Sequence, residues 1–242
     1  MAEAAFWGFV GGASLLLGAA IGLLVPVSQR LIGLVMGFGA GVLISALTFD
    51  LTREAYARGG ADAVAAGLAA GGLAFFAGDW IIDHRGGDDR KRSGGEQADG
   101  SGMAIALGAL LDGIPESAAI GITLLEGNGI GVAFVAAVFL SNLPESMSAA
   151  TGMRKAGRSP RFIVGLWVAV LAASTFASAI GYASLGDASD DVIAVVQAFA
   201  AGAILVMLAD TMMPEGFEHA GSLVGLVTLL GFSTAFLLST LE

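Results

Sequence analysis

The composition of the chain limits the class of protein that it can be. It has 242 residues, of which 56% are hydrophobic and 13% are charged, and its mean hydropathy is +0.82. An average soluble domain carries about twice that share of charge, so these values exclude a cytosolic enzyme and a disordered chain and favour an integral membrane protein. The sequence has no cysteine, which excludes a disulfide framework, a thiolate zinc cluster and a cysteine nucleophile. Its formal net charge of −10 is large for so apolar a chain.

Apolar runs recur along the whole chain. A helix needs about 20 residues to cross the roughly 30 Å hydrocarbon core of a bilayer. Eight runs of that length predict one all-α transmembrane domain over residues 1–242, with helices at 6–27, 31–56, 61–82, 103–125, 129–152, 162–186, 191–211 and 221–240. The segment 83–102 is rich in glycine and charged residues, and we expect it to be a flexible cytoplasmic loop.

The basic residues predict the orientation of these helices, because Lys and Arg are concentrated in cytoplasmic loops. Three predicted loops on one side of the membrane hold nine of the eleven basic residues, namely Arg30, Arg85, Arg90, Lys91, Arg92, Arg154, Lys155, Arg158 and Arg161. The opposite side holds only Arg53 and Arg58. This asymmetry predicts an even number of crossings with both termini outside.

Three carboxylates fall near the middle of predicted transmembrane helices. Asp112 and Glu116 are four residues apart in the fourth helix, and Glu145 follows Ser141 and Asn142 in the fifth by four and three residues. Residues at these spacings share one helix face. Neither helix core contains Lys or Arg. Ionisable groups at this depth cost about 2.5–3.5 kcal/mol each on insertion scales and usually mark function, so a cation site is favoured over packing between protonated acids.

A proline precedes each of the two glutamates. The segments read Ile-Pro-Glu-Ser at 114–117 and Leu-Pro-Glu-Ser at 143–146, and a third Pro-Glu pair lies at 214–215. A proline inside a helix bends it and deprives the carbonyl group four residues earlier of its helical donor. We therefore expect kinks in the fourth and fifth helices, with the carbonyl oxygens of Leu111 and Leu140 close to the carboxylates.

With these motifs the chain resembles the ZIP (Zrt/Irt-like) family of divalent-metal transporters over essentially its whole length. Eight helices, outside termini, a variable cytoplasmic loop after the third helix and the two Pro-Glu motifs match. The family has a His-Asn-x-Pro-Glu pattern in the fourth helix, where this chain has Asp112 and Gly113. Ser141 and Asn142 stand at the corresponding positions of the fifth helix, and Ser174 lies where the family often has an acid. These departures indicate a divergent member without the usual histidine ligands and argue against a full second metal site.

The resemblance implies a transporter that moves divalent cations into the cytoplasm and requires no cofactor. The expected metal ligands are Asp112, Glu116, Asn142, Glu145, Ser141 and Met36. Core packing is the competing interpretation of Met36. An oxygen-rich set without imidazole or thiolate suits Mn²⁺ or Fe²⁺ better than Zn²⁺, whereas the family suggests zinc, so the ion stays open among Zn, Fe, Mn and Cd.

The resemblance also implies a route and partners. The pathway is expected to pass Asp50 near the outer end of the second helix and Asp210 and Glu215 near the inner end of the seventh. Glu218 and His219 are expected in a solvated loop beyond it, and a weak exit ligand is the alternative interpretation. The expected partners are metal ions and the lipid bilayer, with no nucleic acid. Small-residue ladders leave helix packing within one chain and a homodimer as alternatives. Short loops fit a bacterial inner membrane.

The sequence also bears on functions other than transport. An intramembrane zinc protease requires a His-Glu-x-x-His motif on a helix, whereas the two histidines, His84 and His219, are expected in loops. We therefore predict that the chain is not an enzyme. A protein that keeps the ZIP scaffold but has lost metal transport, and a passive cation channel, stay open.

Overall fold

Helices make up the described part of this computed structural model, which covers residues 1–87, 102–126 and 131–240 and contains no strand in these ranges. The α-helices are α1 (Ala2–Leu24), α2 (Gln29–Ala46), α3 (Arg53–Ile82), α4 (Gly102–Thr123), α5 (Val132–Lys155), α6 (Pro160–Leu185), α7 (Asp190–Met207), α8 (Met213–Ala220) and α9 (Leu223–Ser239). Three π-helical segments adjoin them, namely η1 (Leu47–Thr52), η2 (Asp83–Gly87) and η5 (Leu208–Met212). Most of the expected cytoplasmic loop, 88–101, lies outside the described residues.

Six stretches of the described chain are long and apolar enough to cross a membrane. They are Ala2–Leu24, Gln29–Gly86, Ala104–Thr123, Val132–Lys155, Pro160–Leu185 and Asp190–Ala220. These helices indicate an all-helical membrane protein, as the composition predicts. The second stretch is 58 residues long, and Gly60 interrupts its helical geometry with φ 71° and ψ −171°. Helix α9 is apolar but has only 17 residues, so helix length alone does not establish the predicted number of eight crossings.

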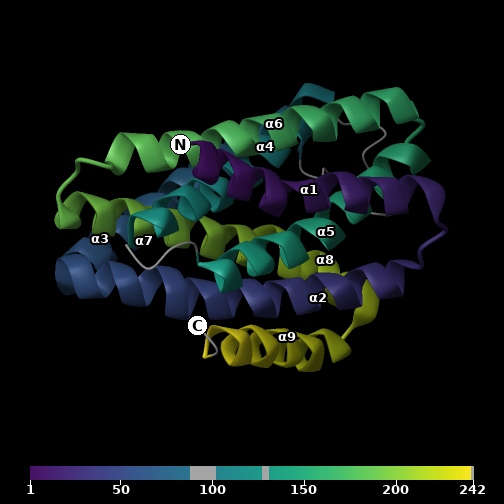
Figure 1. Cartoon of the computed structure of the whole chain (residues 1–242). Helices are drawn as coiled ribbons and strands as arrows, with labels where there is room; N and C mark the ends of the chain where they lie inside the picture. The colour runs from purple at the N-terminus through teal and green to yellow at the C-terminus, as the bar shows by residue number, and fades with distance from the viewer. Residues whose placement is uncertain (88–101, 127–130, 241–242) are drawn as a thin grey trace.

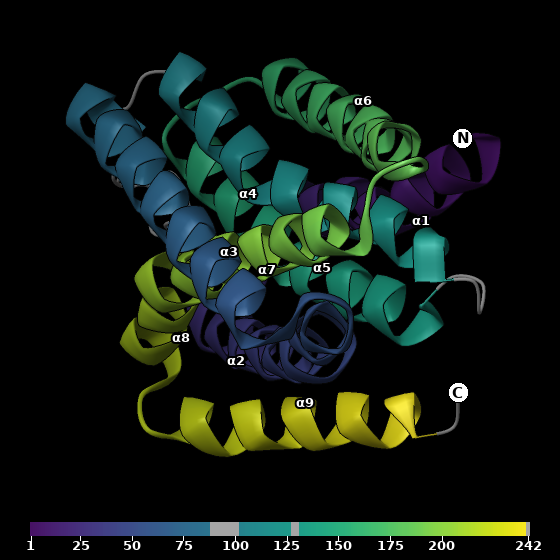
Figure 2. The ribbon, with the colours of Figure 1, turned by 90° about the vertical axis from the view of Figure 1, so that its left-hand side faces the viewer.

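The helices form a bundle of extended rods. Figure 1 shows α6, α1, α5, α2 and α9 following one another from top to bottom, and each contacts the next. The view in Figure 2 places α3 against α7 and α4 beside α6, and the C-terminal helix α9 lies at the edge of the bundle against α2. Helix α5 is buried along most of its length, and α7 packs against α3 on one side of it.

Glycines on α1 bring two neighbouring helices close to it. A Cβ atom at Gly18 would overlap the carbonyl oxygen of Leu143 and the hydroxyl of Ser146, and one at Gly22 would lie 2.6 Å from the carbonyl oxygen of Met147. On the other half of the helix, Gly8 and Gly12 face α6 in the same way. Small residues allow such close helix crossings in membranes. Both ladders of α1 therefore serve packing within one chain.

The ladder on α2 is used in the same way. Gly33 faces α8, while Gly37 and Gly41 face Val224 and Thr228 of α9. The sequence left packing within one chain and a dimer surface as alternatives for these glycines. In the structure they hold α8 and α9 against α2, so these positions supply no surface for a second copy.

The largest apolar core lies where α2, α5 and α7 meet. Its buried members include Met36 and Leu43 of α2, Val138 of α5 and Ile204 of α7, and Ile120 brings α4 into the same cluster. Phe134, Ala137 and Met147 extend the core along α5. The carboxylate-bearing segments of α4 and α5 thus adjoin one continuous core.

Two expectations about the histidines are wrong. His219 lies in α8 rather than in a solvated loop, together with Glu218. His84 lies in η2, where its Nδ1 is 2.8 Å from the carbonyl oxygen of Trp80. Both helices continue further than their apolar runs predict, because hydrogen-bonding polar side chains can extend a helix beyond its apolar part.

Candidate functional site

Helix α4 carries the first pair of predicted ligands. Asp112 and Glu116 are 2% and 1% exposed, although each is a carboxylic acid in an otherwise apolar helix. Their spacing of four residues places them on the same face. Pro115 lies between them inside the helix, and the buried Ala119 and Ile120 follow on the next turn. Helix α4 therefore directs both carboxyl groups into the protein and away from lipid.

Helix α5 carries the second group. Ser141, Asn142 and Glu145 are all buried, with exposed fractions of 0%, 3% and 4%. The Ser141 hydroxyl donates to the carbonyl oxygen of Val138 at 3.0 Å, and Pro144 lies inside the helix one residue before the glutamate. Helix α5 contacts α4, so the two polar groups belong to neighbouring helices.

Helix α2 approaches the same part of α5. A Cβ atom at Gly39 would lie 3.1 Å from the Cα of Ser141, 3.4 Å from the carbonyl oxygen of Leu140 and 3.0 Å from the Cε of Met212. Met36 precedes Gly39 by three residues, which places it on the same side of α2, and it is fully buried in the core. The predicted thioether ligand thus lies on the face of α2 that meets α5 and η5.

The two positions that depart most from the ZIP pattern adjoin one another. A Cβ atom at Gly113 of α4 would lie 3.3 Å from the hydroxyl oxygen of Ser174 on α6. Ser174 is buried, with an exposed fraction of 2%. A glycine and a serine face each other here, and neither supplies a carboxylate or an imidazole.

The expected pathway acids Asp50 and Asp210 both lie in π-helical turns. Asp50 belongs to η1 and is partly buried, whereas Asp210 belongs to η5 and is exposed. Single π-helical turns are frequent at functional sites. Asp79 of α3, which is 7% exposed, interacts electrostatically with Asp210. The two side chains carry like charges, so this interaction between α3 and η5 is a repulsion when both are ionised.

Glu215, the third expected pathway acid, contacts polar side chains of two helices. It is 3% exposed. The Ser148 hydroxyl of α5 donates to its Oε1 at 3.0 Å, and the Nε2 of His219 lies 3.0 Å from the same oxygen. This contact joins α8 to α5 at a residue that follows Glu145 by one helical turn.

All six predicted ligand residues are buried, but they do not form a ready-made metal cluster. Among the described residues, no group of three or more His, Cys, Asp and Glu side chains is close enough to hold a metal ion. The predicted set also includes amide, hydroxyl and thioether groups, in addition to its three carboxylates. The ligand set therefore stays a prediction.

The sequence interpretation gave no role to two polar residues of this region, Asp79 and Ser148, and it favoured a solvated loop for His219. For Asp79 the signal was present, because it is an acid within the apolar run that ends at Ile82. Ser148 follows Glu145 by three residues and extends the same helix face. The partner of His219 had a local signal, since Glu215 precedes it by four residues and α8 brings the two side chains together.

Known proteins give one informative similarity. No protein-family profile matches the chain. A protein of Arabidopsis thaliana named "Putative zinc transporter" is 25% identical to it over 229 residues, which are 93% of this chain and 36% of the Arabidopsis protein. The chain thus spans well under half the length of the curated relative that it matches. At this identity the similarity indicates a distant relative that is named as a transporter.

Proposed function

We propose that the chain is a ZIP-like transporter that carries divalent metal cations across a membrane through a carboxylate site between α4 and α5. The ligands are Asp112, Glu116, Asn142, Glu145, Ser141 and Met36. The ions are of the Zn, Fe or Mn type, with Cd as a further candidate, and they move into the cytoplasm. The host membrane is a bacterial inner membrane. A homodimer, which the resemblance implies, would use a surface other than the glycine ladders of α1 and α2.

The observation that carries this proposal is the burial of three carboxyl groups in an apolar bundle. Asp112, Glu116 and Glu145 are all at most 4% exposed, while α4 contains no Lys or Arg and α5 has them only in its last turn. Each ionised group at this depth costs about 2.5–3.5 kcal/mol on insertion scales. A bound cation offsets that cost and so accounts for three ionised carboxylates in an apolar bundle.

The chemistry of the ligands indicates which metal ions the site should prefer. The set holds carboxylate, amide and hydroxyl oxygens and a single thioether, with no imidazole or thiolate. Such oxygen-rich sets suit harder ions such as Mn²⁺ and Fe²⁺. The name of the Arabidopsis relative mentions zinc, so Zn²⁺ belongs in any panel of test ions.

A stripe of polar residues on α5 supports a route from the site to the inner side. Ser141, Glu145 and Ser148 follow one another at spacings of four and three residues, which keeps them on one face. The last of them donates to Glu215, and Asp210 lies in the adjoining η5. We infer that the ion passes Asp50, binds between α4 and α5 and leaves past Glu215 and Asp210, as one group of helices rocks against another.

Eight crossings with both termini outside complete the proposal. A straight helix over Gln29–Gly86 would be about 87 Å long at 1.5 Å per residue, nearly three times the hydrocarbon thickness. The break at Gly60 supports two crossings within this stretch. Counted with α9, the chain then crosses the membrane eight times.

Flux into proteoliposomes tests the site. The full-length chain is reconstituted and uptake of Mn²⁺, Fe²⁺, Zn²⁺, Cd²⁺ and Mg²⁺ is compared with that of Glu116→Gln and Glu145→Gln. These variants keep the side-chain shape but lose the charge, so uptake is expected to fall by about tenfold or more. Glu3→Gln, which changes an exposed acid of α1, is the matched control and keeps the uptake of the unchanged chain. Equal uptake in all variants would refute the site.

A second candidate is a protein that has kept the scaffold but does not transport metal. The observation in its favour is that three acid, histidine or cysteine side chains do not come together among the described residues. It predicts no uptake of any ion in the panel and no change in bound metal when Glu116 or Glu145 is replaced. Uptake that does not saturate with ion concentration would instead indicate a passive channel.

A further inference from the structure

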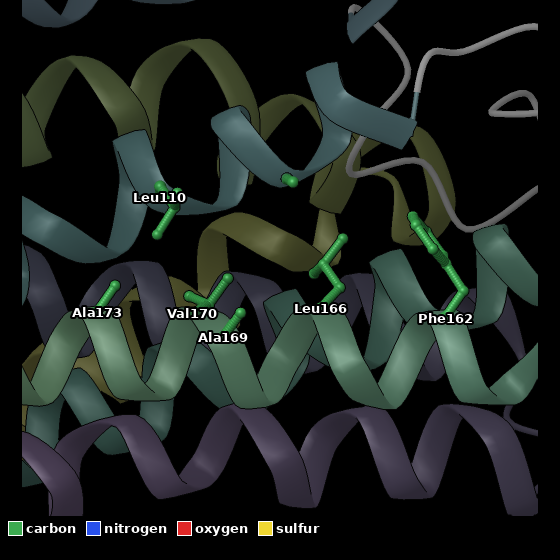
Figure 3. A pocket seen from close by; sticks show the side chains of 7 residues that line it. Leu110, Phe162, Leu166, Ala169, Val170 and Ala173 are labelled. Carbon is green, nitrogen blue, oxygen red and sulfur yellow. The ribbon is translucent and has the colours of Figure 1, made fainter.

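An apolar pocket opens on the outer surface of the bundle between α4 and α6. Its volume is about 230 Å³, and it is lined by two residues of α4 and five of α6, all of them apolar. Figure 3 shows Leu110 of α4 opposite Leu166, Val170 and Ala173 of α6. Val170 and Leu166 are buried and form the floor, whereas Ala169 and Phe162 are exposed at the opening. The pocket therefore faces the surroundings of the protein rather than the transport site.

The shape of the pocket matches half of a bilayer. Its wall on α6 runs from Phe162, in the first turn, to Ala173, a length of about 16 Å at 1.5 Å per residue. One leaflet of the hydrocarbon core is about 15 Å thick. The α6 stretch is also the least buried of the membrane-spanning candidates, at 33%. An object lying along this wall would extend from the helix end to the bilayer centre.

Positive charge lies at one end of the pocket. The guanidinium carbon of Arg158 is 5.9 Å from the centroid of the Phe162 ring, and this ring lines the pocket. Arg161 immediately precedes Phe162 and is exposed. The opposite end, at Ala173, is apolar. The pocket thus combines an apolar slot with a cationic end, which is the polarity of an anionic phospholipid.

We propose that this pocket binds one acyl chain of an anionic phospholipid from the surrounding leaflet, with the phosphate group held by Arg158 and Arg161. The small side chains of Ala169 and Ala173 leave room for the chain. Each arginine near the phosphate favours an anionic headgroup over a zwitterionic one. The bound lipid covers the α4–α6 seam on the outer surface of the bundle, and it is independent of the ion that the protein transports.

The test is lipid binding by the purified, delipidated full-length chain, followed by native mass spectrometry. Dioleoyl phosphatidylglycerol and dioleoyl phosphatidylcholine are titrated separately. We expect one tightly retained phosphatidylglycerol, and weaker binding of phosphatidylcholine. Replacing Arg158 or Arg161 by Gln lowers this preference by about fivefold each, while the acyl chain is still accepted.

Substitutions at two alanines of α6 distinguish lipid binding in the pocket from binding elsewhere on the lipid-facing surface. Ala169→Phe fills the pocket and weakens phosphatidylglycerol binding by about tenfold or more. Ala172→Phe adds the same ring to an exposed position outside the pocket and leaves binding unchanged. Ala173→Leu fills the same slot by a smaller change, so it must reproduce the loss even if the phenylalanine variant folds poorly.

Three results would overturn the proposal. The first is equal retention of the two lipids by the unchanged chain. The second is unchanged phosphatidylglycerol binding in Ala169→Phe or Ala173→Leu. The third is a change of oligomeric state in these variants without a change in lipid binding, which would assign the face to a second copy of the chain.

Discussion

At the scale of single residues, a carboxyl group inside an apolar bundle needs a proton, a cation or hydrogen-bond donors. Glu215 shows the last of these arrangements, because Ser148 and His219 both contact its Oε1 at 3.0 Å. A buried acceptor that loses a donor bears the cost of its desolvation, whereas the loss of an exposed hydrogen bond costs little. The Ser148–Glu215 contact should therefore stabilise the packing of α8 against α5.

Ser148→Ala tests this contact. We expect the free energy of unfolding to fall by about 1–3 kcal/mol, because Glu215 stays buried without that donor. Ser184→Ala is the control, since its exposed hydroxyl donates to the carbonyl oxygen of Ile180 within α6 and its loss should change stability by less than about 0.5 kcal/mol. Thermal unfolding in detergent, followed by circular dichroism, measures both. Equal midpoints for the two variants would contradict the assigned role of the contact.

The carboxylates of α4 and α5 could be found from the sequence, but the contacts of Glu215 could be found only in part. Burial of Asp112, Glu116 and Glu145 follows from their place in long apolar runs, which leave no polar surface for them. The spacing of Glu215 and His219 gives a local signal once α8 is known to be helical. Ser148, by contrast, is 67 residues away from Glu215, and single-sequence periodicity says nothing about such a pairing.

At the scale of elements, the glycines of α2 determine how closely α9 approaches it. A Cβ atom at Gly41 would overlap the carbonyl oxygen of Thr228, which is backbone and cannot rotate away, whereas one at Gly37 would lie 2.9 Å from the side-chain Cγ1 of Val224. Phe49 of η1 adds ring contacts with Phe232 and Phe236 of α9. The α2–α9 contact should thus be most sensitive at Gly41.

A graded series of alanine substitutions tests this contact. Gly41→Ala is expected to lower the free energy of unfolding by about 1–3 kcal/mol through overpacking, and Gly37→Ala by less, because the Val224 side chain can move. Gly165→Ala is the control: this glycine of α6 has open space around its Cβ position, and alanine there is neutral or stabilising. Unfolding midpoints in detergent should follow that order. Three equal midpoints would show that the close approach of α9 is not needed for stability.

Sequence patterns predict where helices lie better than how they join. The apolar runs and the Gly-rich charged segment are visible directly in the composition. The break within Gln29–Gly86 depends on a single residue, Gly60, with positive φ. It lies inside α3, which begins seven residues earlier, at Arg53. The π-helical turns of η1 and η5 arise where the hydrogen-bond register shifts within a helix, and neither turn has a periodicity of its own that a sequence pattern could reveal.

At the scale of the whole molecule, acids inside the bundle account for half of the net charge of −10. Asp79, Asp112, Glu116, Glu145 and Glu215 are all buried in the bundle. Nine of the eleven basic residues fall instead in the predicted loops of one side. Acids in the interior and bases mainly at one surface are what the proposed transporter and its proposed orientation require.

The orientation can be tested with single cysteines, because the chain has none of its own. Ser189 and Ser222 are exposed N-terminal residues of α7 and α9 whose side chains cap neither helix, so Ser→Cys is nearly isosteric at both. In intact cells, an impermeant maleimide should label Ser189→Cys from outside, whereas Ser222→Cys should react only after the membrane is opened. Ala61→Cys, next to Gly60, should react from outside if Gln29–Gly86 crosses twice. If that stretch crossed only once, Ala61 would lie near its middle and be protected from both sides, and the eight-crossing proposal would be wrong. If Ser222→Cys were labelled in intact cells, the orientation of the whole bundle would be opposite to the one proposed.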